Sequence, residues 1–404
     1  MEELQHEVSA GRSKRALALI GLALVVLAVT AGSYLWRGAS SKDGAPVPLK
    51  ASGTVLVDMA SISEQEAWVI LHNAGAPESA LFHTGDGGAS WSRQLAIEGL
   101  GSVRFAASGT GVLLNWRLGA DPRTSTPRVF STDDGGIHWR PVGLPQLDAG
   151  IRGVPFFLDP DHGWLLATRP GSAPDRTDEI TLWRTLNGGR GWEPLLKIDD
   201  AHPLSHGISA GDQLAAVAFQ DRDNGWIVTQ GAAASSAVYA TRDGGREWTR
   251  VALPAGLPAA ALQDWVYVGT PAVRADGRGV VPVVDRDANR TWLYQTPDDG
   301  LTWTNPQPAP GTSVADVVFV DGTVGWASGT STVWVSGDSG RTWLSATGLA
   351  GNFVFGVLAP ASSSVAWVQG IEVKGGLTTG TSWTLFRTID GGVHWTRVQP
   401  PKLA

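Results

Sequence analysis

Residues 132–139 read Thr-Asp-Asp-Gly-Gly-Ile-His-Trp, and related stretches recur six more times along the chain. Each begins with Thr or Ser, has Asp or Asn at the third place, Gly at the fifth and Trp at the eighth. We call this eight-residue stretch the turn box. The seven boxes end at Trp91, Trp139, Trp192, Trp248, Trp303, Trp343 and Trp395. A spacing of about fifty residues indicates a repeat architecture rather than a set of unrelated domains.

A second motif precedes most turn boxes by about twenty residues. Gly or Ala followed by Trp occurs in five units, at Trp68, Trp164, Trp226, Trp326 and Trp367. Units two and five keep only Gly111-Val112 and Gly279-Val280 at this place. Three units embed the pair in a longer phrase, Phe-x-Asp-x-x-x-Gly-Trp, which starts at Phe157, Phe219 and Phe319. Both motifs therefore belong to one repeating unit.

An aromatic residue stands two places before every turn box. These residues are Phe82, Phe130, Trp183, Tyr239, Tyr294, Trp334 and Phe386. An aromatic residue, a turn and a returning Trp predict a hairpin whose arms present large side chains to a neighbouring layer. In unit six, β-branched and aromatic runs predict strands over 315–320, 325–328, 332–335 and 342–345. The predicted fold class is all-β, a seven-bladed β-propeller of four-stranded blades over residues 52–404.

The polar residues of the turn boxes are those expected of a tight turn. The third-place residues are Asp86, Asp134, Asn187, Asp243, Asp298, Asp338 and Asp390. Such a side chain accepts backbone N–H groups just ahead of it, and the fifth-place Gly tolerates a positive φ. Each box offers one carboxylate, whereas a calcium loop offers several. We therefore expect a structural turn, and no metal or cofactor.

Composition and charge exclude several classes of protein. The chain has 404 residues with 51 Gly, 24 Pro, 19 Trp and no Cys, so disulfides, thiolate metal sites and cysteine nucleophiles are absent. Its net charge of −7 argues against a nucleic-acid partner, since such binders carry a basic excess. The Gly and Pro content argues against a helical bundle.

The N-terminus has the features of a membrane anchor. Residues 16–36 form an uncharged stretch that is long enough for a helix to cross a bilayer. Arg12, Lys14 and Arg15 stand directly before it. We expect residues 1–15 in the cytoplasm, a transmembrane helix over 16–36, a linker over 37–51, and the propeller outside the cytoplasm. The alternative is a signal peptide cleaved after Val29-Thr30-Ala31, which would release a secreted protein.

The Ser/Thr-x-Asp-x-Gly-x-x-Trp pattern of the turn boxes resembles the Asp-box, or BNR, repeat of sialidases, xyloglucanases and sortilin-type receptors. With the Phe-x-Asp-x-x-x-Gly-Trp phrase, the chain is similar over about residues 52–399 to the photosystem II stability and assembly factor family. That resemblance implies a seven-bladed, non-enzymatic scaffold that binds membrane-protein subunits during assembly. The family uses an arginine-rich patch, and no motif here matches its positions one by one.

A sialidase-like glycosidase or glycan-binding propeller is the alternative function. A sialidase needs three arginines for the substrate carboxylate and a Tyr nucleophile activated by Glu. The chain has four Tyr residues; Tyr34 lies in the apolar span and two others lie in the repeated aromatic place, which leaves Tyr267. His202 and His206 are close in sequence but lack evident partner ligands, so we expect solvated loop residues there.

Arginines in the loops between second and third strands are the candidate binding residues. They are Arg117, Arg123, Arg128, Arg169, Arg176, Arg286 and Arg290. Arginine favours bidentate pairing with carboxylates and stacking at interfaces. The longest loops are predicted over 117–128, 169–181, 198–213 and 370–382. We expect protein partners, including subunits of membrane complexes, while the opposing interpretation is ordinary surface arginines paired with nearby Asp.

Overall fold

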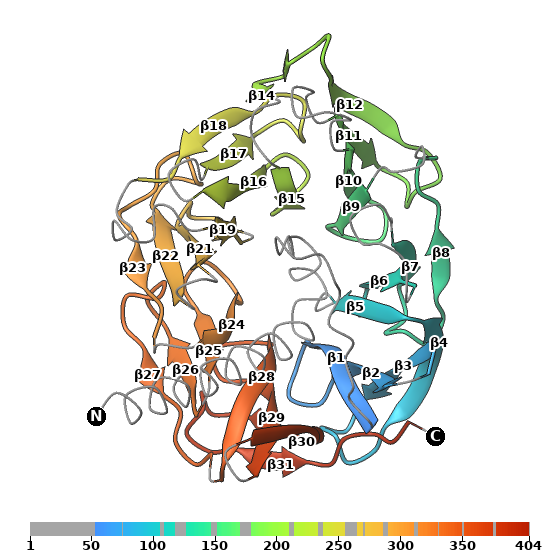
Figure 1. Cartoon of the computed structure of the whole chain (residues 1–404), viewed down its shortest axis with the longest axis vertical. Helices are drawn as coiled ribbons and strands as arrows, with labels where there is room; N and C mark the ends of the chain where they lie inside the picture. The colour runs from blue at the N-terminus through green and yellow to red at the C-terminus, as the bar shows by residue number, and fades with distance from the viewer. Residues whose placement is uncertain are drawn as a thin grey trace, which may run out of the picture.

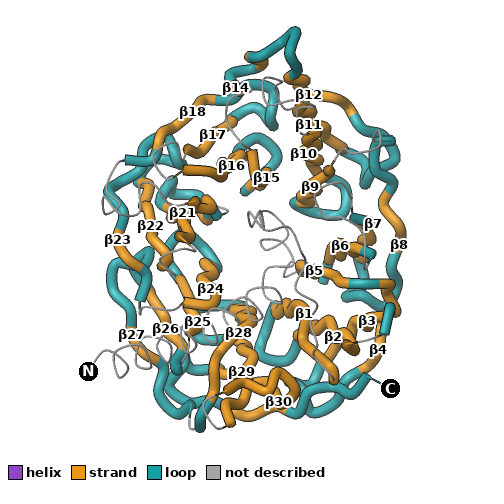
Figure 2. The backbone as a smooth tube through the Cα atoms, viewed as in Figure 1, coloured by secondary structure: helices purple, strands orange, loops and turns teal. Residues whose placement is uncertain are grey.

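The computed structural model describes most of the chain after residue 52. The described ranges are 53–74, 76–105, 109–117, 127–146, 152–169, 179–209, 214–232, 237–254, 265–269, 271–285, 290–310, 314–329, 331–349, 351–374 and 377–403. The predicted anchor and linker lie outside them. Among the described residues, no helix is both long and apolar enough to cross a membrane. Figure 2 accordingly colours the described chain as strands and loops alone.

Seven blades stand radially around a central opening, as Figure 1 shows. Five of them are separate four-stranded sheets, and the strands of blades 4 and 5 are joined in one nine-stranded sheet. Blade 1 contains β1 (Gly53–Ser61), β2 (Ala67–Ala74), β3 (Glu78–Thr84) and β4 (Ser92–Glu98). Blade 2 contains β5 (Leu100–Phe105), β6 (Gly111–Trp116), β7 (Arg128–Thr132) and β8 (Arg140–Val142). Blade 3 contains β9 (Arg152–Phe157), β10 (Gly163–Arg169), β11 (Glu179–Thr185) and β12 (Glu193–Ile198). Blade 4 contains β15 (Leu214–Phe219), β16 (Gly225–Ala232), β17 (Ala237–Thr241) and β18 (Thr249–Ala252).

The remaining three blades complete the ring. Blade 5 contains β19 (Trp265–Val268) with β20 (Ala272–Val273), β21 (Gly279–Asp285), β22 (Arg290–Thr296) and β23 (Gln307–Pro308). Blade 6 contains β24 (Val314–Phe319), β25 (Gly325–Gly329), β26 (Val333–Ser336) and β27 (Leu344–Ser345). Blade 7 contains β28 (Phe353–Pro360), β29 (Ala366–Lys374), β30 (Leu377–Thr388) and β31 (Thr396–Val398). The predicted seven-bladed, four-stranded propeller is confirmed.

The Phe-x-Asp-x-x-x-Gly-Trp phrase encodes the turn between the first two strands of a blade. In blade 4, the ring of Phe219 at the end of β15 covers Gly225 at the start of β16. A Cβ on Gly225 would lie 2.4 Å from that ring, so only glycine fits. A Cβ would overlap a Phe ring in the same way at Gly163 and Gly325. It would also do so at Gly111 of blade 2, where the ring is that of Phe105, although blade 2 lacks the full phrase.

Buried hydrophobic clusters join successive blades. Six clusters lie between blades 1 and 2, 3 and 4, 4 and 5, 5 and 6, 6 and 7, and 7 and 1. In the part of the chain that the structure describes, no such cluster joins blades 2 and 3. There the indole Nε1 of Trp192 donates to the carbonyl of Gly143 at 2.8 Å. Most of the Trp residues are thus part of the frame, as the repeat predicts.

The ring closes by packing, without an exchanged strand. All four strands of blade 1 come from one end of the chain and all four of blade 7 from the other. Arg387 Nη1 donates to the carbonyls of Glu64 and Gly87 at 2.7 and 3.1 Å, and Trp383 Nε1 donates to Thr54 O at 2.8 Å. Blade 1 thus packs directly against blade 7.

Two predicted loops contain strands. Residues 370–382 were expected to form a loop, but β29 and β30 extend through most of them as a long hairpin. Asn352 supports this hairpin by donating from Nδ2 to Val373 O at 3.0 Å and accepting the amide of Val373 at 2.8 Å. Residues 198–213 include a short hairpin of β13 (Leu204–Ser205) and β14 (Ile208–Ser209), whose His206 carbonyl accepts the amide of Trp248.

Candidate functional site

The propeller has two faces, which the strand directions define. The box face carries the turn boxes and the turns between first and second strands. The loop face, at the other end of the blades, carries the connections between second and third strands, where the candidate arginines lie. Of these seven arginines, the structure describes Arg117, Arg128, Arg169 and Arg290. The other three, Arg123, Arg176 and Arg286, lie outside the described residues.

Two loop-face arginines of blade 2 share one carboxylate of blade 1. Arg117 Nε lies 3.3 Å and Arg128 Nη2 lies 3.8 Å from Glu98 Oε2, at the end of β4. Arg128 also donates to Asn115 Oδ1 at 2.8 Å. All three charged side chains remain about half exposed or more. The cluster holds two positive charges against one negative, so it retains capacity for a second carboxylate.

The arginine of blade 3 lies in a balanced network. Arg169 Nη1 lies 3.4 Å from Glu179 Oε2, and Lys197 Nζ lies 3.7 Å from Glu179 Oε1 and 3.3 Å from Asp199 Oδ2. Arg290 of blade 5 is exposed and forms no ion pair with a described residue. The loop-face arginines thus lie on three blades. The described ones do not lie together with side chains that could form a catalytic site.

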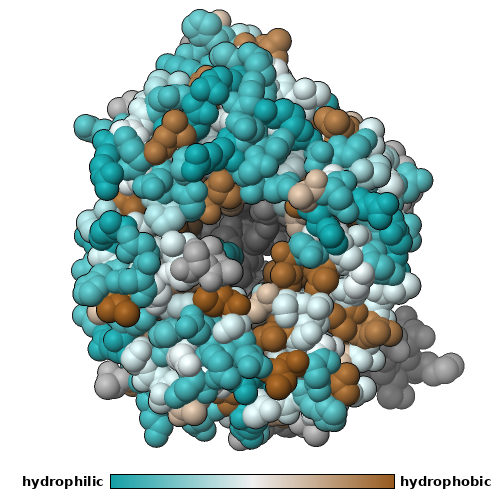
Figure 3. Space-filling view, turned by 180° about the vertical axis from the view of Figure 1, so that it is seen from behind, coloured by the Kyte–Doolittle hydropathy of each residue, from teal (hydrophilic) through white to brown (hydrophobic). Residues whose placement is uncertain are grey.

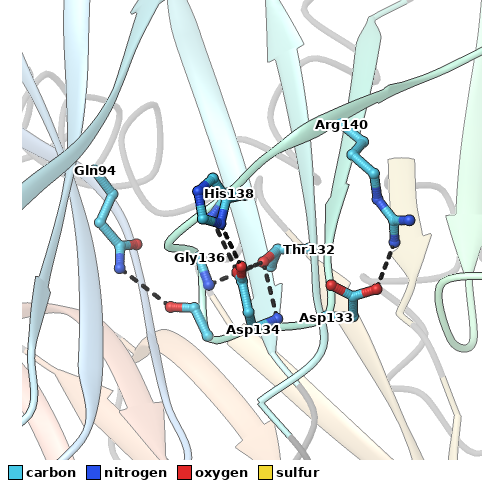
Figure 4. A network of polar contacts seen from close by, with 8 residues as sticks. Gln94, Thr132, Asp133, Asp134, Gly136, His138 and Arg140 are labelled. Atoms are coloured by element: carbon cyan, nitrogen blue, oxygen red, sulfur yellow. Dashed lines mark hydrogen bonds and ion pairs between the residues drawn. The ribbon is translucent and has the colours of Figure 1, made fainter.

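Each turn box is held by hydrogen bonds centred on its first and third residues. In blade 2, Thr132 Oγ1 donates to Asp134 Oδ1 at 2.8 Å and accepts the amide of Gly136 at 2.9 Å (Figure 4). Asp134 Oδ1 also accepts the amide of His138 at 3.0 Å. The two contacts of the first-place hydroxyl recur in all seven blades.

These hydrogen bonds keep the box carboxylates ionised. The side chain and amide of Ser90 lower the pKa of Asp86 to about 2. The amide and ring of His394 lower the pKa of Asp390 to about 2, and those of His138 lower the pKa of Asp134. In blade 3, Asn187 Oδ1 accepts the amide of Gly191 at 2.9 Å without a charge. A neutral side chain performs the same task, which is the behaviour of a turn acceptor rather than an acid or base.

The turn box is hydrogen-bonded to the turn between the first and second strands of its own blade, which we call the first turn. The fourth-place amide donates to a carbonyl of that turn in every blade. The donors are Gly87, Gly135, Gly188, Gly244, Asp299, Ser339 and Gly391, and their acceptors are Gln65, Gly109, Asp161, Asp223, Gly277, Thr323 and Ser364. This bond explains why the two sequence motifs occur together.

Five arginines that the sequence interpretation passed over lie exposed on the box face. Arg190, Arg246 and Arg341 occupy the sixth place of their turn boxes, and Arg222 and Arg278 lie in first turns. None of the five forms an ion pair with a described residue, and they extend over blades 3 to 6. Exposed Asp161, Asp223 and Asp276 share this face, so its character is mixed rather than basic. The sequence pattern that could have pointed to this set is the recurrence of Arg at the variable sixth place of three turn boxes.

A small hollow lies between blades in the described part of the chain. It measures 160 Å³ and is lined by residues from blades 3 to 6, including Phe156, Phe219, Trp226, Ala272, Val320 and Asp321. Figure 3, which views the molecule from behind Figure 1, shows hydrophobic residues gathered beside the central opening among mainly hydrophilic blades. The hollow has room for a side chain and not for a drug-sized ligand.

The remaining candidates lie apart from one another. His202 Nδ1 contacts Asp199 Oδ1 at 3.0 Å, and His206 Nδ1 contacts Glu247 Oε1 at 3.0 Å, so the two imidazoles have separate partners. Among the described residues, no group of three His, Asp or Glu is arranged to hold a metal ion. Tyr267 lies in β19, where it pairs with Gln230 of β16 and links blade 5 to blade 4.

Solved structures share this fold at low sequence identity. YCF48 from Cyanidioschyzon merolae is 17% identical with a TM-score of 0.51, covering 85% of this chain and 97% of that chain. YCF48 bound to D1 peptide is 16% identical with a TM-score of 0.50, covering 86% and 98%. An acylaminoacyl peptidase of Pyrococcus horikoshii is 10% identical with a TM-score of 0.54, covering 88% of this chain but 53% of that chain.

These likenesses establish the propeller fold and its structural similarity to YCF48. No protein-family model matches the chain, and no curated protein matches it.

Proposed function

We propose that this protein is a non-enzymatic, protein-binding scaffold, anchored in a membrane with its propeller outside the cytoplasm. One observation carries the proposal: the chain spans 98% of a YCF48 structure that is bound to a D1 peptide. By contrast, it spans about half of the similar peptidase, 53% of that chain. The likeness thus extends to a whole propeller that acts on its own, as an assembly factor for membrane-protein subunits does.

The exposed arginines of the box face are the binding residues that we propose for this scaffold. Their guanidinium groups form no ion pair with a described residue, whereas Arg117, Arg128 and Arg169 of the loop face each form one. Among the described loop-face candidates, Arg290 alone shares this lack of an ion pair with a described residue. An unpaired guanidinium offers a bidentate site to a carboxylate of a partner without first breaking an internal pair. The loop-face arginines are the second candidate set.

Affinity purification from detergent-solubilised membranes tests the scaffold. The tagged full-length chain is compared with a tagged, unrelated single-pass protein, and recovered proteins are quantified by mass spectrometry. We expect specific membrane proteins to be enriched with the propeller. Recovery of the same background in both samples would remove the support for a scaffold.

Enzyme assays test the non-enzymatic part of the proposal. A fluorogenic sialoside and a panel of polysaccharides should remain unchanged in the presence of the purified chain. Turnover that the substitution Tyr267→Phe abolishes would contradict the proposal and favour a glycosidase.

A further inference from the structure

The chain joins the propeller on its loop face. β1 begins at Gly53, which pairs with Ala74 at the end of β2, beside the turn into β3. In blade 2 the same end carries Leu100, paired with Trp116, and the neighbouring Arg117. The carbonyl of Thr54 accepts Trp383 Nε1 at 2.8 Å, which fixes the first strand against blade 7. Whatever precedes Gly53 therefore leaves from the loop face, at the junction of blades 7 and 1.

The length of the preceding sequence limits how far this face can stand from a membrane. Sixteen residues separate the predicted span, which ends at Trp36, from Gly53, and they are rich in Gly, Ser, Ala and Pro. A flexible chain of that length has a root-mean-square end-to-end distance of about 20–25 Å. The nine residues of β1 give the blade a height of about 30 Å. The average span expected for sixteen residues without fixed structure is therefore smaller than the thickness of the propeller, while their fully extended length, about 55 Å, exceeds it.

We propose that the propeller stands with its loop face toward the bilayer and its box face away from it. This inference rests on the membrane anchor of the proposed function. The short average span of the tether favours this orientation. The described ion pairs of the loop face leave a small positive excess, since Glu98 faces both Arg117 and Arg128, while Glu179 and Asp199 face Arg169 and Lys197. This excess gives the face a weak attraction for anionic lipid.

This orientation determines the kind of partner that each face meets. Arg190, Arg246 and Arg341, which form no ion pair with a described residue, lie on the face farther from the bilayer. They are placed to bind a protein segment that extends away from the membrane, such as an extracytoplasmic loop, domain or tail of a membrane protein. Segments embedded in the lipid reach the loop face alone.

Energy transfer to the bilayer measures the orientation directly. The chain has no Cys, so Arg290→Cys on the loop face and Arg341→Cys on the box face each give one labelling site, matched in residue type and exposure. Each labelled full-length variant is reconstituted into phosphatidylcholine vesicles that contain an acceptor-labelled lipid headgroup. Transfer from position 290 should be several-fold more efficient than from position 341, since about 30 Å separates the faces.

Flotation of the same vesicles separates the two possible failures. If the full-length chain does not float with the vesicles, the membrane anchor fails and the orientation falls with it. If the chain floats but transfer from position 341 equals or exceeds that from position 290, the anchor stands and the orientation is wrong. Deletion of residues 1–36 is the control, and should abolish both flotation and transfer.

Discussion

At the scale of single residues, the turn box follows closely from its sequence. The roles of the third-place Asp and the fifth-place Gly were predicted from the chemistry of turns. The backbone conformation of the fourth place was not predicted. It has a positive φ in every blade, even where the residue is not Gly: φ is 60° at Asp299 and 63° at Ser339. An Asp or Ser in the sequence does not by itself indicate a positive φ. It is imposed by the bond from the fourth-place amide to the first turn of the same blade.

The space around each box glycine gives a prediction with a matched control. In Gly88→Ala, the new Cβ would lie 2.2 Å from Val398 Cγ1, and φ is 88°. Gly135 has a φ of 73° but nothing within 4 Å of such a Cβ. We expect Gly135→Ala to lower the free energy of unfolding by about 1–2 kcal/mol through backbone strain alone. Gly88→Ala should cost about 2–4 kcal/mol, since overpacking adds to the strain.

Chemical denaturation of both variants provides the measurement. Equal losses in the free energy of unfolding for the two variants would show that Gly88 does not pack against Val398 of blade 7.

The box carboxylates predict how stability depends on pH. Hydrogen bonds hold the pKa of Asp86 and Asp390 at about 2 in the folded protein, against 3.8 for the free group. Groups with a lowered folded pKa stabilise the fold above the unfolded value, and this contribution is lost as the pH falls toward the folded value. Thermal midpoints should therefore fall between pH 4 and pH 2. The double variant Asp86→Asn, Asp390→Asn should show a shallower fall, and an unchanged slope would contradict this assignment.

At the scale of elements, the repeat predicted strands well and loops poorly. The four strands expected in unit six match β24 to β27 within two residues at each end. Residues 370–382 were expected to form a loop. Their strands are supported by hydrogen bonds to Asn352, which directly precedes β28, and no local pattern reveals this contact. The pairing of Glu98 with Arg117 and Arg128 is also non-local, since it joins two blades.

The aromatic ring over the first turn should be a major stabilising contact of its blade. Phe219 is buried, stacks on Trp164 with ring centroids 3.5 Å apart and meets Trp248 edge-on. We expect Phe219→Ala to reduce the free energy of unfolding by about 3–5 kcal/mol. Leu204→Ala is the control, because Leu204 is 68% exposed, and should change it by less than about 0.5 kcal/mol. Urea denaturation would measure the free energy of unfolding of both variants. A loss under about 1 kcal/mol for Phe219→Ala would contradict the packing of Phe219 on Trp164 and Trp248.

At the scale of the whole molecule, the number of blades followed from counting complete units. Each unit contains its own four strands, so blades 7 and 1 meet through side chains. The sequence could not reveal which residues do this, because they come from opposite ends of the chain. Nor could it show that Arg190, Arg246 and Arg341 are exposed on the box face without an ion pair to a described residue, since exposure and ion pairing depend on neighbouring blades.

Ring closure gives a prediction at this scale. Arg387→Leu removes the donor shared by Glu64 O and Gly87 O and leaves those carbonyls without it. We expect a loss of about 1.5–3 kcal/mol in the free energy of unfolding. Arg341→Leu, at an exposed arginine that forms no ion pair with a described residue, should change it by less than about 0.5 kcal/mol. Comparable effects from the two substitutions would argue against closure through Arg387.

The most direct test of the central claim compares the two faces in partner recovery. Arg190, Arg246 and Arg341 are replaced together by Gln in one full-length variant, and Arg117, Arg128 and Arg290 in another. Both are purified from detergent-solubilised membranes beside the unsubstituted chain, with equal thermal midpoints as a check on folding. We predict that the box-face variant loses the co-purifying membrane proteins while the loop-face variant keeps them. Retention by the box-face variant, with loss from the loop-face variant, would contradict the account.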